Sequence, residues 1–304
     1  MNSNGFTKVS SFSALRNLQL KRRFFLISDK MCILFFHIDG NPGPDGYKLI
    51  LASNRDEFYA RPTAKAHAWK NTPWIFGGFD LEPGKEGGTW LGLSAKDGIL
   101  KFGALLNLTG EARSADFLGR GSIVTNYLTG EKTNSEYCQE LLDSHDKYSA
   151  FNFLSAELNK SNSSTLFFSN ILPTVISYEE KRPHGFGNSL PSKPLQKVIE
   201  GELKFSQIIN DVKNLTKDEI KSKCLELLKI KEKHWPDEEL KRRAPKWGEY
   251  LSSVFVNVPN AGYGTRTHTV IIVDANNKVD IYEETMTSTD PEGEWDHTHI
   301  KANF

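Results

Sequence analysis

Hydrophobic and polar positions form their densest pattern just after residue 30, where strand-like segments begin. The runs 32–38 (CILFFHI) and 47–53 (YKLILAS) are rich in branched and aromatic residues, which favours strands. The turn-forming residues 41–46 (NPGPDG) separate the two runs. This pattern predicts an antiparallel hairpin whose second strand ends near residue 54.

Beyond the hairpin, segments whose apolar residues repeat with helical spacing are interspersed with short strand-like apolar runs. Helices are predicted over 121–145, 195–212 and 218–233. Thr216 and Glu219 predict a capping box at the start of the last of these helices. Strands are predicted over 103–108, 151–158, 165–168 and 252–258, and a second hairpin over 269–273 and 279–283. Strand groups flank helical groups, so the predicted class is α+β with layered sheets and helices.

Composition narrows the classes of function. The 304 residues contain 38 Lys and Arg against 38 Asp and Glu, so no overall charge favours nucleic acid as a partner. The three cysteines Cys32, Cys138 and Cys224 are few and far apart, which excludes a disulfide framework and gives no metal-site spacing. No apolar run reaches the roughly 18 residues of a membrane-spanning helix.

Residues 1–30 differ in composition from the rest of the chain. They are basic and rich in serine, and Asp29 is their one acid. Three interpretations remain: a mitochondrial presequence, a disordered leader ahead of an alternative start at Met31, or a folded segment with a structural role. Residues 31–304 are interpreted as a single domain.

Cys32 is the first candidate for chemistry, because it directly follows Met31 at the start of the first strand. If the mature chain begins at Cys32, the thiol is a nucleophile and its own α-amine is a nearby base. The alternative is an inert cysteine buried in the core.

Arg55 and Asp56, within the segment NRDE at 54–57, are expected to lie beside Cys32, because antiparallel pairing brings the two strand ends together. The guanidinium would favour the thiolate, and the carboxylate would hold the α-ammonium. A cluster of caps and salt bridges that organises the turn explains the same residues equally well.

Three further residues fit the same chemistry. Asn107 ends a predicted strand, Asn188 lies in a turn, and Arg266 precedes the strand at 269. A side-chain amide from either Asn can donate to a developing oxyanion. The alternatives are ordinary turn asparagines and a solvated arginine.

Together these segments resemble one family. Its motifs are Met31-Cys32, NRDE at 54–57, GGTWLG at 87–92, GNSL at 187–190 and GYGTRT at 262–267. In this order they resemble the transport and Golgi organization protein 2 family, also called the NRDE family, from Met31 to about Trp295. The resemblance implies an N-terminal-nucleophile (Ntn) hydrolase-like fold, a four-layer αββα sandwich. It also implies Ntn-type catalytic roles for Cys32, Arg55, Asp56, Asn107, Asn188 and Arg266.

The function that the resemblance implies is non-enzymatic. Family members are associated with haem trafficking, with lipid and acyl-coenzyme A homeostasis and with Golgi organisation, and with a cytoplasmic and mitochondrial location. The expectation is therefore a carrier of haem or an acyl lipid, with haem as cargo and neither a resident cofactor nor a metal. Its expected ligand-binding residues are Asn54, Arg55, Asp56, Glu57 and Trp90.

Two alternatives to the carrier remain. The first is a cysteine hydrolase that cleaves an amide or thioester, which requires a free α-amine on Cys32. The second is a scaffold that acts on secretory membranes through protein partners. For haem, Cys32 and His37 share a strand but are expected on opposite faces, so they cannot both ligate one iron.

Overall fold

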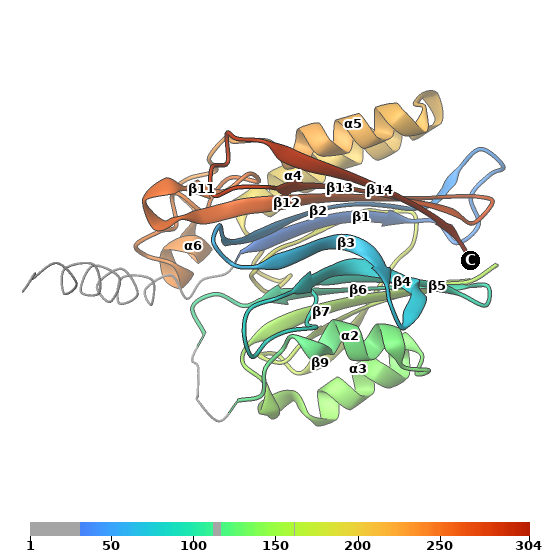
Figure 1. Cartoon of the computed structure of the whole chain (residues 1–304), viewed down its shortest axis with the longest axis horizontal. Helices are drawn as coiled ribbons and strands as arrows, with labels where there is room; N and C mark the ends of the chain where they lie inside the picture. Colours follow the sequence, from blue (N-terminus) through green and yellow to red (C-terminus); the bar gives the residue numbers. More distant parts are fainter. Residues whose placement is uncertain (1–30, 112–116, 161) are drawn as a thin grey trace, which may run out of the picture.

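Two antiparallel sheets face each other at the centre of the molecule, and helices cover the outer face of each sheet (Figure 1). The computed structural model describes residues 31–111, 117–160 and 162–304. The predicted four-layer αββα sandwich is confirmed by this arrangement. The basic segment 1–30, predicted to be a leader or presequence, lies outside the described residues.

The first sheet carries the strand that begins at Cys32. Its strand order is β10-β1-β2-β12-β13-β14, with β11 paired to β12, and every pairing is antiparallel. The strands are β1 (Cys32–Ile38), β2 (Tyr47–Phe58), β10 (Pro183–Phe186), β11 (Asn257–Val258), β12 (Tyr263–Asp274), β13 (Lys278–Met286) and β14 (Trp295–Asn303).

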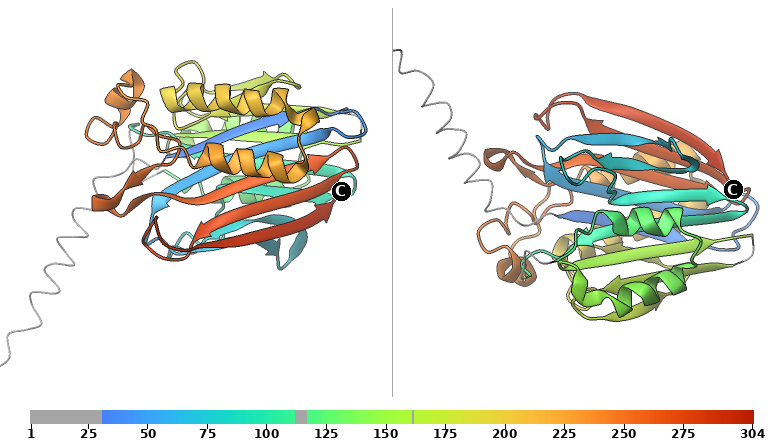
Figure 2. Two further views of the ribbon diagram at one scale, coloured as in Figure 1. Left: turned by 90° about the horizontal axis from the view of Figure 1, so that it is seen from above. Right: turned by 60° about the horizontal axis from the view of Figure 1, so that its bottom comes forward.

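The second sheet follows the order of the chain, from β3 to β9, without a crossover. Its strands are β3 (Thr63–Trp69), β4 (Thr72–Asp80), β5 (Leu91–Lys96), β6 (Ile99–Asn107), β7 (Phe151–Leu158), β8 (Ser163–Ser169) and β9 (Thr174–Tyr178). Figure 2 shows the two sheets and their covering helices from two further directions.

The helices divide between the two outer faces. Helices α4 (Gln196–Asn210) and α5 (Lys217–Leu228) pack on the first sheet, and α2 (Ser122–Thr129) and α3 (Asn134–Asp143) pack on the second. The remaining helical segments are α6 (Glu238–Arg243), η1 (His145–Lys147), η2 (Val212–Asn214) and η3 (Pro259–Ala261).

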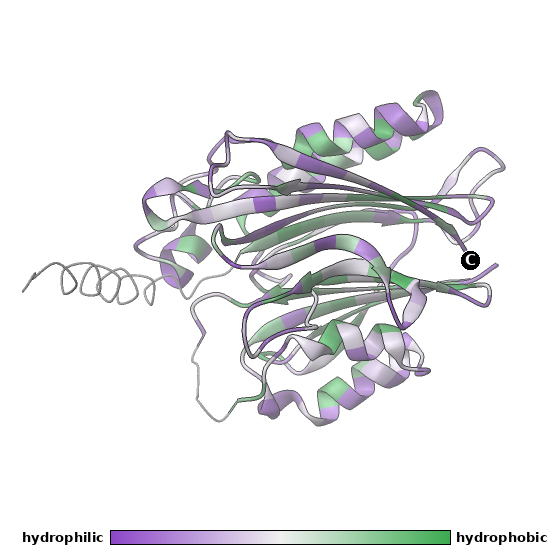
Figure 3. Cartoon of the chain, viewed as in Figure 1, coloured by the Kyte–Doolittle hydropathy of each residue, from purple (hydrophilic) through white to green (hydrophobic). Residues whose placement is uncertain are grey.

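Three hydrophobic cores lie between the four layers. One fills the space between the sheets, and each of the others lies between a sheet and its helices. In β1 the odd-numbered Ile33 and Phe35 face the helices, whereas the even-numbered Leu34 and Phe36 face the second sheet. Figure 3 shows hydrophobic positions concentrated along the strands, with hydrophilic positions on the outward sides of the helices. Burial on both faces explains why the first hairpin has so continuous an apolar sequence.

Most predicted elements are confirmed. The hairpin of β1 and β2 forms, although β2 continues to Phe58, and Thr216 caps α5 in a capping box. The helix predicted over 121–145 is two helices, and the helix predicted over 218–233 ends at Leu228.

The strand predicted over 252–258 is wrong except for its last two residues. The Ser253 hydroxyl donates to the Phe255 carbonyl, and the Phe255 N–H donates to the Ile230 carbonyl. These local bonds satisfy the backbone in a buried loop, so the apolar pattern reflects burial rather than pairing.

We expect Gly201→Ala to destabilise the protein, although alanine favours helix by about 1 kcal/mol over glycine. An added Cβ at Gly201 would overlap the buried ring of Phe35. Overpacking of this kind costs about 1–3 kcal/mol, so we expect a net loss of about 1 kcal/mol in urea unfolding. Gln207→Ala, at an exposed position of the same helix, is the control and should change stability little. A Gly201→Ala protein as stable as the wild type would contradict the tight packing.

Candidate functional site

Cys32 lies at the floor of a cleft of about 530 Å³. It is the first residue of β1 and pairs directly with Arg55 of β2, so both side chains lie on the same face of the sheet. Cys32 is 8% exposed as a residue. Burial, followed by the Asp56 carboxylate, raises the pKa of the Cys32 thiol to about 12. In the chain that retains Met31, Cys32 is therefore protonated at neutral pH.

Arg55 forms part of the cleft wall with an aromatic partner. Its guanidinium carbon lies 4.2 Å from the ring centroid of Trp90, a cation–π contact. Its Nη2 lies 3.7 Å from Glu57 Oε2, whereas its buried Nη1 has no hydrogen-bond partner among the described residues. A buried guanidinium donor is rarely left unsatisfied, so Nη1 marks Arg55 as an unusual residue of the cleft lining.

A chain of alternating charges extends from Arg55 along the wall. Glu57 lies 3.4 Å from Arg61, which makes two bonds to Asp80, including Nη2 to Oδ2 at 2.5 Å. These contacts hold the cationic wall rigid. The remaining described cleft-lining residues are Asp56, Gly84, Lys85, Glu86, Gly87, Gly88, Thr89, Leu105, Asn107, Phe117, Leu118, Gly119, Arg120, Gly121, Ser122 and Ser149.

Asp56 is buried at the edge of this site. Its Oδ1 accepts from the Thr265 hydroxyl at 2.6 Å, and its Oδ2 has no hydrogen-bond partner among the described residues. Burial raises the pKa of Asp56 to about 6, against the opposing influence of Lys197, Thr265 and Arg55.

Lys197, at the start of α4, is a residue that the sequence reasoning missed. Its side chain is fully buried, and its Nζ also has no hydrogen-bond partner among the described residues. Burial lowers the pKa of Lys197, and the charges of Asp56 and Cys32 raise it. The helical period of the sequence could have predicted its burial, since Lys197 lies on the same face of α4 as the buried Gly201 and Phe205.

Residue 31 occupies the position next to the Cys32 nitrogen. The Met31 N–H donates to the Tyr263 hydroxyl at 2.6 Å, and its carbonyl accepts from the Asp56 N–H at 3.1 Å. The Cys32 N–H donates to Asn188 Oδ1 at 2.5 Å. Polar groups from distant parts of the chain therefore surround the peptide bond between Met31 and Cys32.

Asn107 and Asn188 support the site together. The Asn188 Nδ2 donates to the Asn107 main-chain carbonyl at 2.6 Å, which orients Oδ1 toward the Cys32 nitrogen. Asn107 is the last residue of β6 and lines the cleft. The structure therefore brings Cys32, Arg55 and both asparagines together.

Arg266 and Asn54 lie outside the cleft. The Arg266 Nη1 donates to the carbonyls of Phe58 and Arg61, which secures the end of β2. Asn54 faces the helices: its Nδ2 donates to the Leu228 carbonyl at 2.8 Å and the Val254 carbonyl at 3.0 Å. Strand alternation thus places residues 55 and 57 on one face and residues 54 and 56 on the other.

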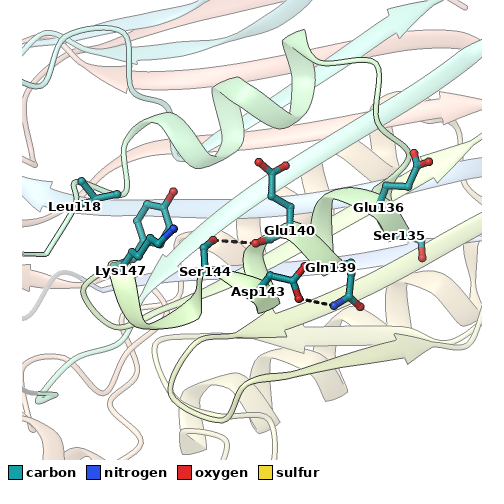
Figure 4. Close-up of a pocket in the computed structure, with 9 residues that line it drawn as sticks. Leu118, Ser135, Glu136, Gln139, Glu140, Asp143, Ser144 and Lys147 are labelled. Atoms are coloured by element: carbon teal, nitrogen blue, oxygen red, sulfur yellow. Dashed lines mark hydrogen bonds between the residues drawn. The ribbon is translucent and has the colours of Figure 1, made fainter.

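A larger hollow of about 790 Å³ lies on the outside of α3 (Figure 4). Its polar side chains bond within the helix, with Gln139 Nε2 donating to Asp143 Oδ1 and the Ser144 hydroxyl donating to the Glu140 carbonyl. None of the predicted site residues lines it. The cleft at Cys32 is therefore the candidate site.

A sequence model of the family described as transport and Golgi organisation 2 matches residues 31–288. The chain belongs to this family. It is 48% identical over 279 residues to transport and Golgi organization protein 2 of Drosophila melanogaster, covering 90% of this chain and 99% of the relative. The homologues of Mus musculus and Homo sapiens are each 34% identical, over 267 and 272 residues, covering 86% of this chain and 95% of theirs.

Solved structures give a weaker likeness to this family member. Anbu from Hyphomicrobium sp. strain MC1 aligns with a TM-score of 0.34 and 10% identity, covering 80% of this chain and 82% of that one. Anbu from Yersinia bercovieri aligns with a TM-score of 0.33 and 14% identity, covering 80% of each chain. These scores are too low to transfer any property of Anbu.

Within the described ranges, no helix is long and apolar enough to cross a bilayer. The same residues contain no group of three or more His, Cys, Asp or Glu side chains arranged to hold a metal ion.

We expect Asp56→Asn to become more stable relative to the wild type as pH rises. A carboxyl whose pKa is raised from 3.8 to about 6 by folding stabilises the native state below pH 4 and loses that contribution above pH 6. The difference in unfolding free energy should therefore shift toward the variant by about 2.5 kcal/mol between pH 4 and pH 8, measured in urea.

Asp80→Asn is the matched control for this experiment. Burial alone would raise the pKa of Asp80, but the hydrogen bonds from Arg61 lower it overall. Its ion pair stabilises the fold above pH 4, so this variant should be destabilised to a similar extent at pH 8 and pH 4 and recover relative to the wild type only below pH 4. If the unfolding free energies of both variants changed with pH in the same way relative to the wild type, the raised pKa of Asp56 would be contradicted.

Proposed function

We propose that this family member binds an acyl lipid in the Cys32 cleft and carries it, with the acyl headgroup against Arg55. The supporting observation is the buried Arg55 Nη1, which has no hydrogen-bond partner among the described residues and lines a cleft with Cys32. An acyl carbonyl or carboxylate supplies the acceptor that this donor lacks.

The rest of the cleft lining supports an amphiphilic ligand. Phe117 and Leu118 are 37% and 53% exposed beside it, and Trp90 and Leu105 continue the apolar lining inward. Lys85 and Arg120 add cationic side chains to the same lining. This combination suits an alkyl chain joined to an anionic head, as in acyl-coenzyme A.

Haem fits this cleft less well as the cargo. Haem iron takes His, Met, Tyr or a Cys thiolate as its protein ligand, and Cys32 is the one such residue among the described lining residues. A thiol with a pKa of about 12 is a poor source of thiolate. His37 offers no second ligand, because residues of its parity on β1 face the helices.

A second candidate function is hydrolysis of the acyl compound by Cys32. The groups around the peptide bond between residues 31 and 32 favour it: without residue 31, the Cys32 amine would lie beside Asn188 Oδ1 and near the unsatisfied Asp56 Oδ2. The thiolate would attack the acyl carbonyl and release an amine or thiol, and water would then cleave the acyl-cysteine.

We place the carrier at internal membranes. The curated relatives are named for transport and Golgi organisation. Movement of acyl lipids between the cytoplasm, the Golgi and mitochondria would connect that name to lipid homeostasis.

Decanoyl-coenzyme A binding, measured by calorimetry, tests the carrier. We expect Arg55→Gln to weaken binding about 10-fold, because it removes a charged donor to the head. Lys96→Gln is the control, since Lys96 also lies over a tryptophan, Trp74 at 4.7 Å, but outside the cleft. Haemin binding that is insensitive to Arg55→Gln, without decanoyl-coenzyme A binding, would contradict the acyl assignment.

Release of coenzyme A distinguishes the carrier from the hydrolase. The assay compares the full chain with a chain that begins at Cys32 and follows free thiol after decanoyl-coenzyme A is added. A carrier leaves the thioester intact in both forms. A hydrolase releases coenzyme A only from the chain with a free Cys32 amine, and Cys32→Ser abolishes that release.

A further inference from the structure

A second cavity, of about 490 Å³, lies on the opposite face of the first sheet from the Cys32 cleft. It lies just beyond the C-terminal end of α5, whose position over this sheet is visible in Figure 1. Its lining residues are Lys229, Lys231, Phe255, His268, Glu284, Pro291, Trp295 and His297. None of the residues assigned to the cleft is among them.

A row of paired polar residues connects Asn54, the first residue of the NRDE segment, with this cavity. Asn54 pairs with His268, His268 with Glu284, and Glu284 with His297, across β2, β12, β13 and β14. Because paired residues share a face, all four side chains lie on the helix side of the sheet. Asn54 forms the buried end of the row, and His297 forms the exposed end.

Asn54 determines the tautomer of His268. Both protons of its Nδ2 go to the carbonyls of Leu228 and Val254, so its Oδ1 is an acceptor toward His268 Nδ1 at 2.6 Å. Nδ1 therefore carries the proton, and Nε2 is a bare acceptor. Burial and then Lys229 lower the pKa of His268 to about 3, so the ring is neutral.

The bare Nε2 of His268 has no hydrogen-bond partner among the described residues, although the residue is only 1% exposed. The atom is not among the fully buried ones without a partner, so its remaining exposure is to the cavity that His268 lines. Its position on the cavity lining makes it a hydrogen-bond acceptor for a donor bound there.

Aromatic rings form the walls around this acceptor. Trp295 stacks on His268 with centroids 4.8 Å apart and planes 14° apart, and Phe255 lies 6.4 Å from Trp295. Stacked and tilted rings at a cavity favour a flat aromatic guest.

Two lysines border the cavity. Lys231 lies 5.3 Å from the Phe255 ring centroid and 2.8 Å from Glu292, and Lys229 lies 2.7 Å from Glu284. Each ammonium has three N–H donors and uses one on its glutamate, so donors remain for an anionic group.

We propose that this cavity is a second binding site, for a planar aromatic anion that donates an O–H or N–H to His268 Nε2 and places its anionic group at Lys231. The site is independent of the acyl function proposed for the Cys32 cleft.

The test uses 6-hydroxy-2-naphthoate with the full chain, and its binding is followed by ligand fluorescence. Its plane, hydroxyl and carboxylate match the three features of the cavity. We expect 2-naphthoate, which lacks the hydroxyl, to bind about 5-fold more weakly. We expect 2-naphthol, which lacks the carboxylate, to bind more weakly by a similar factor.

Variants then locate the site. Lys231→Met should weaken binding of 6-hydroxy-2-naphthoate about 5-fold, and Trp295→Leu should weaken it further. Lys233→Met is the matched control and should leave affinity unchanged: Lys233 also lies over an aromatic ring, 4.9 Å from Tyr250, and pairs with Glu249. His268→Phe should remove the preference for the hydroxyl, and far-ultraviolet circular dichroism checks that this buried variant folds.

Three results would overturn the proposal. The first is equal affinity for all three naphthalenes, the second is equal effects of Lys231→Met and Lys233→Met, and the third is binding unaffected by Trp295→Leu. If His268→Phe does not fold, the two surface variants still decide the outcome, because Lys231 and Trp295 are partly exposed.

Discussion

The antiparallel pairing of β1 with β2 determines where every residue of the cleft lies. Cys32 is paired with Arg55, and a slip of one residue would send the guanidinium to the helix side and bring Asn54 into the cleft. Burial of both faces prevents such a slip, since each face of β1 contributes to a different hydrophobic core. The position of the thiol beside Trp90 and the charged wall is thus a consequence of core packing.

Buried polar groups at this site make the local structure costly. Asp56 Oδ2 and Lys197 Nζ both lack a hydrogen-bond partner within the described residues, although their opposite charges influence each other. Buried ionisable groups without hydrogen bonds cost several kcal/mol of stability. Sites that retain such groups are commonly functional, because shifted pKa values are useful in binding and chemistry.

The sequence predicted the parts of the fold that depend on local period. The first hairpin, the capping box at Thr216 and the strand at 151–158 follow from alternation and caps. The strands β3 and β4, with their glycines and short polar stretches, and the solvent-facing β14 carry weaker apolar patterns and were missed. Convergence of Asn188 on the Cys32 nitrogen arises from pairing between β1 and β10, which no local pattern encodes. Strand alternation predicts that Asn54 and Arg55 face opposite sides of the sheet. The expectation that all of residues 54–57 bind one ligand did not take this alternation into account.

Consecutive residues of β2 therefore face two different environments, the core beneath the helices and the Cys32 cleft. Asn54 stabilises the loop at 252–256 and the end of α5 through its amide, whereas Arg55 faces the cleft. A substitution at position 54 would remove these two bonds and act through the stability of the fold. A substitution at position 55 would instead alter the cleft that contains Cys32 and Trp90.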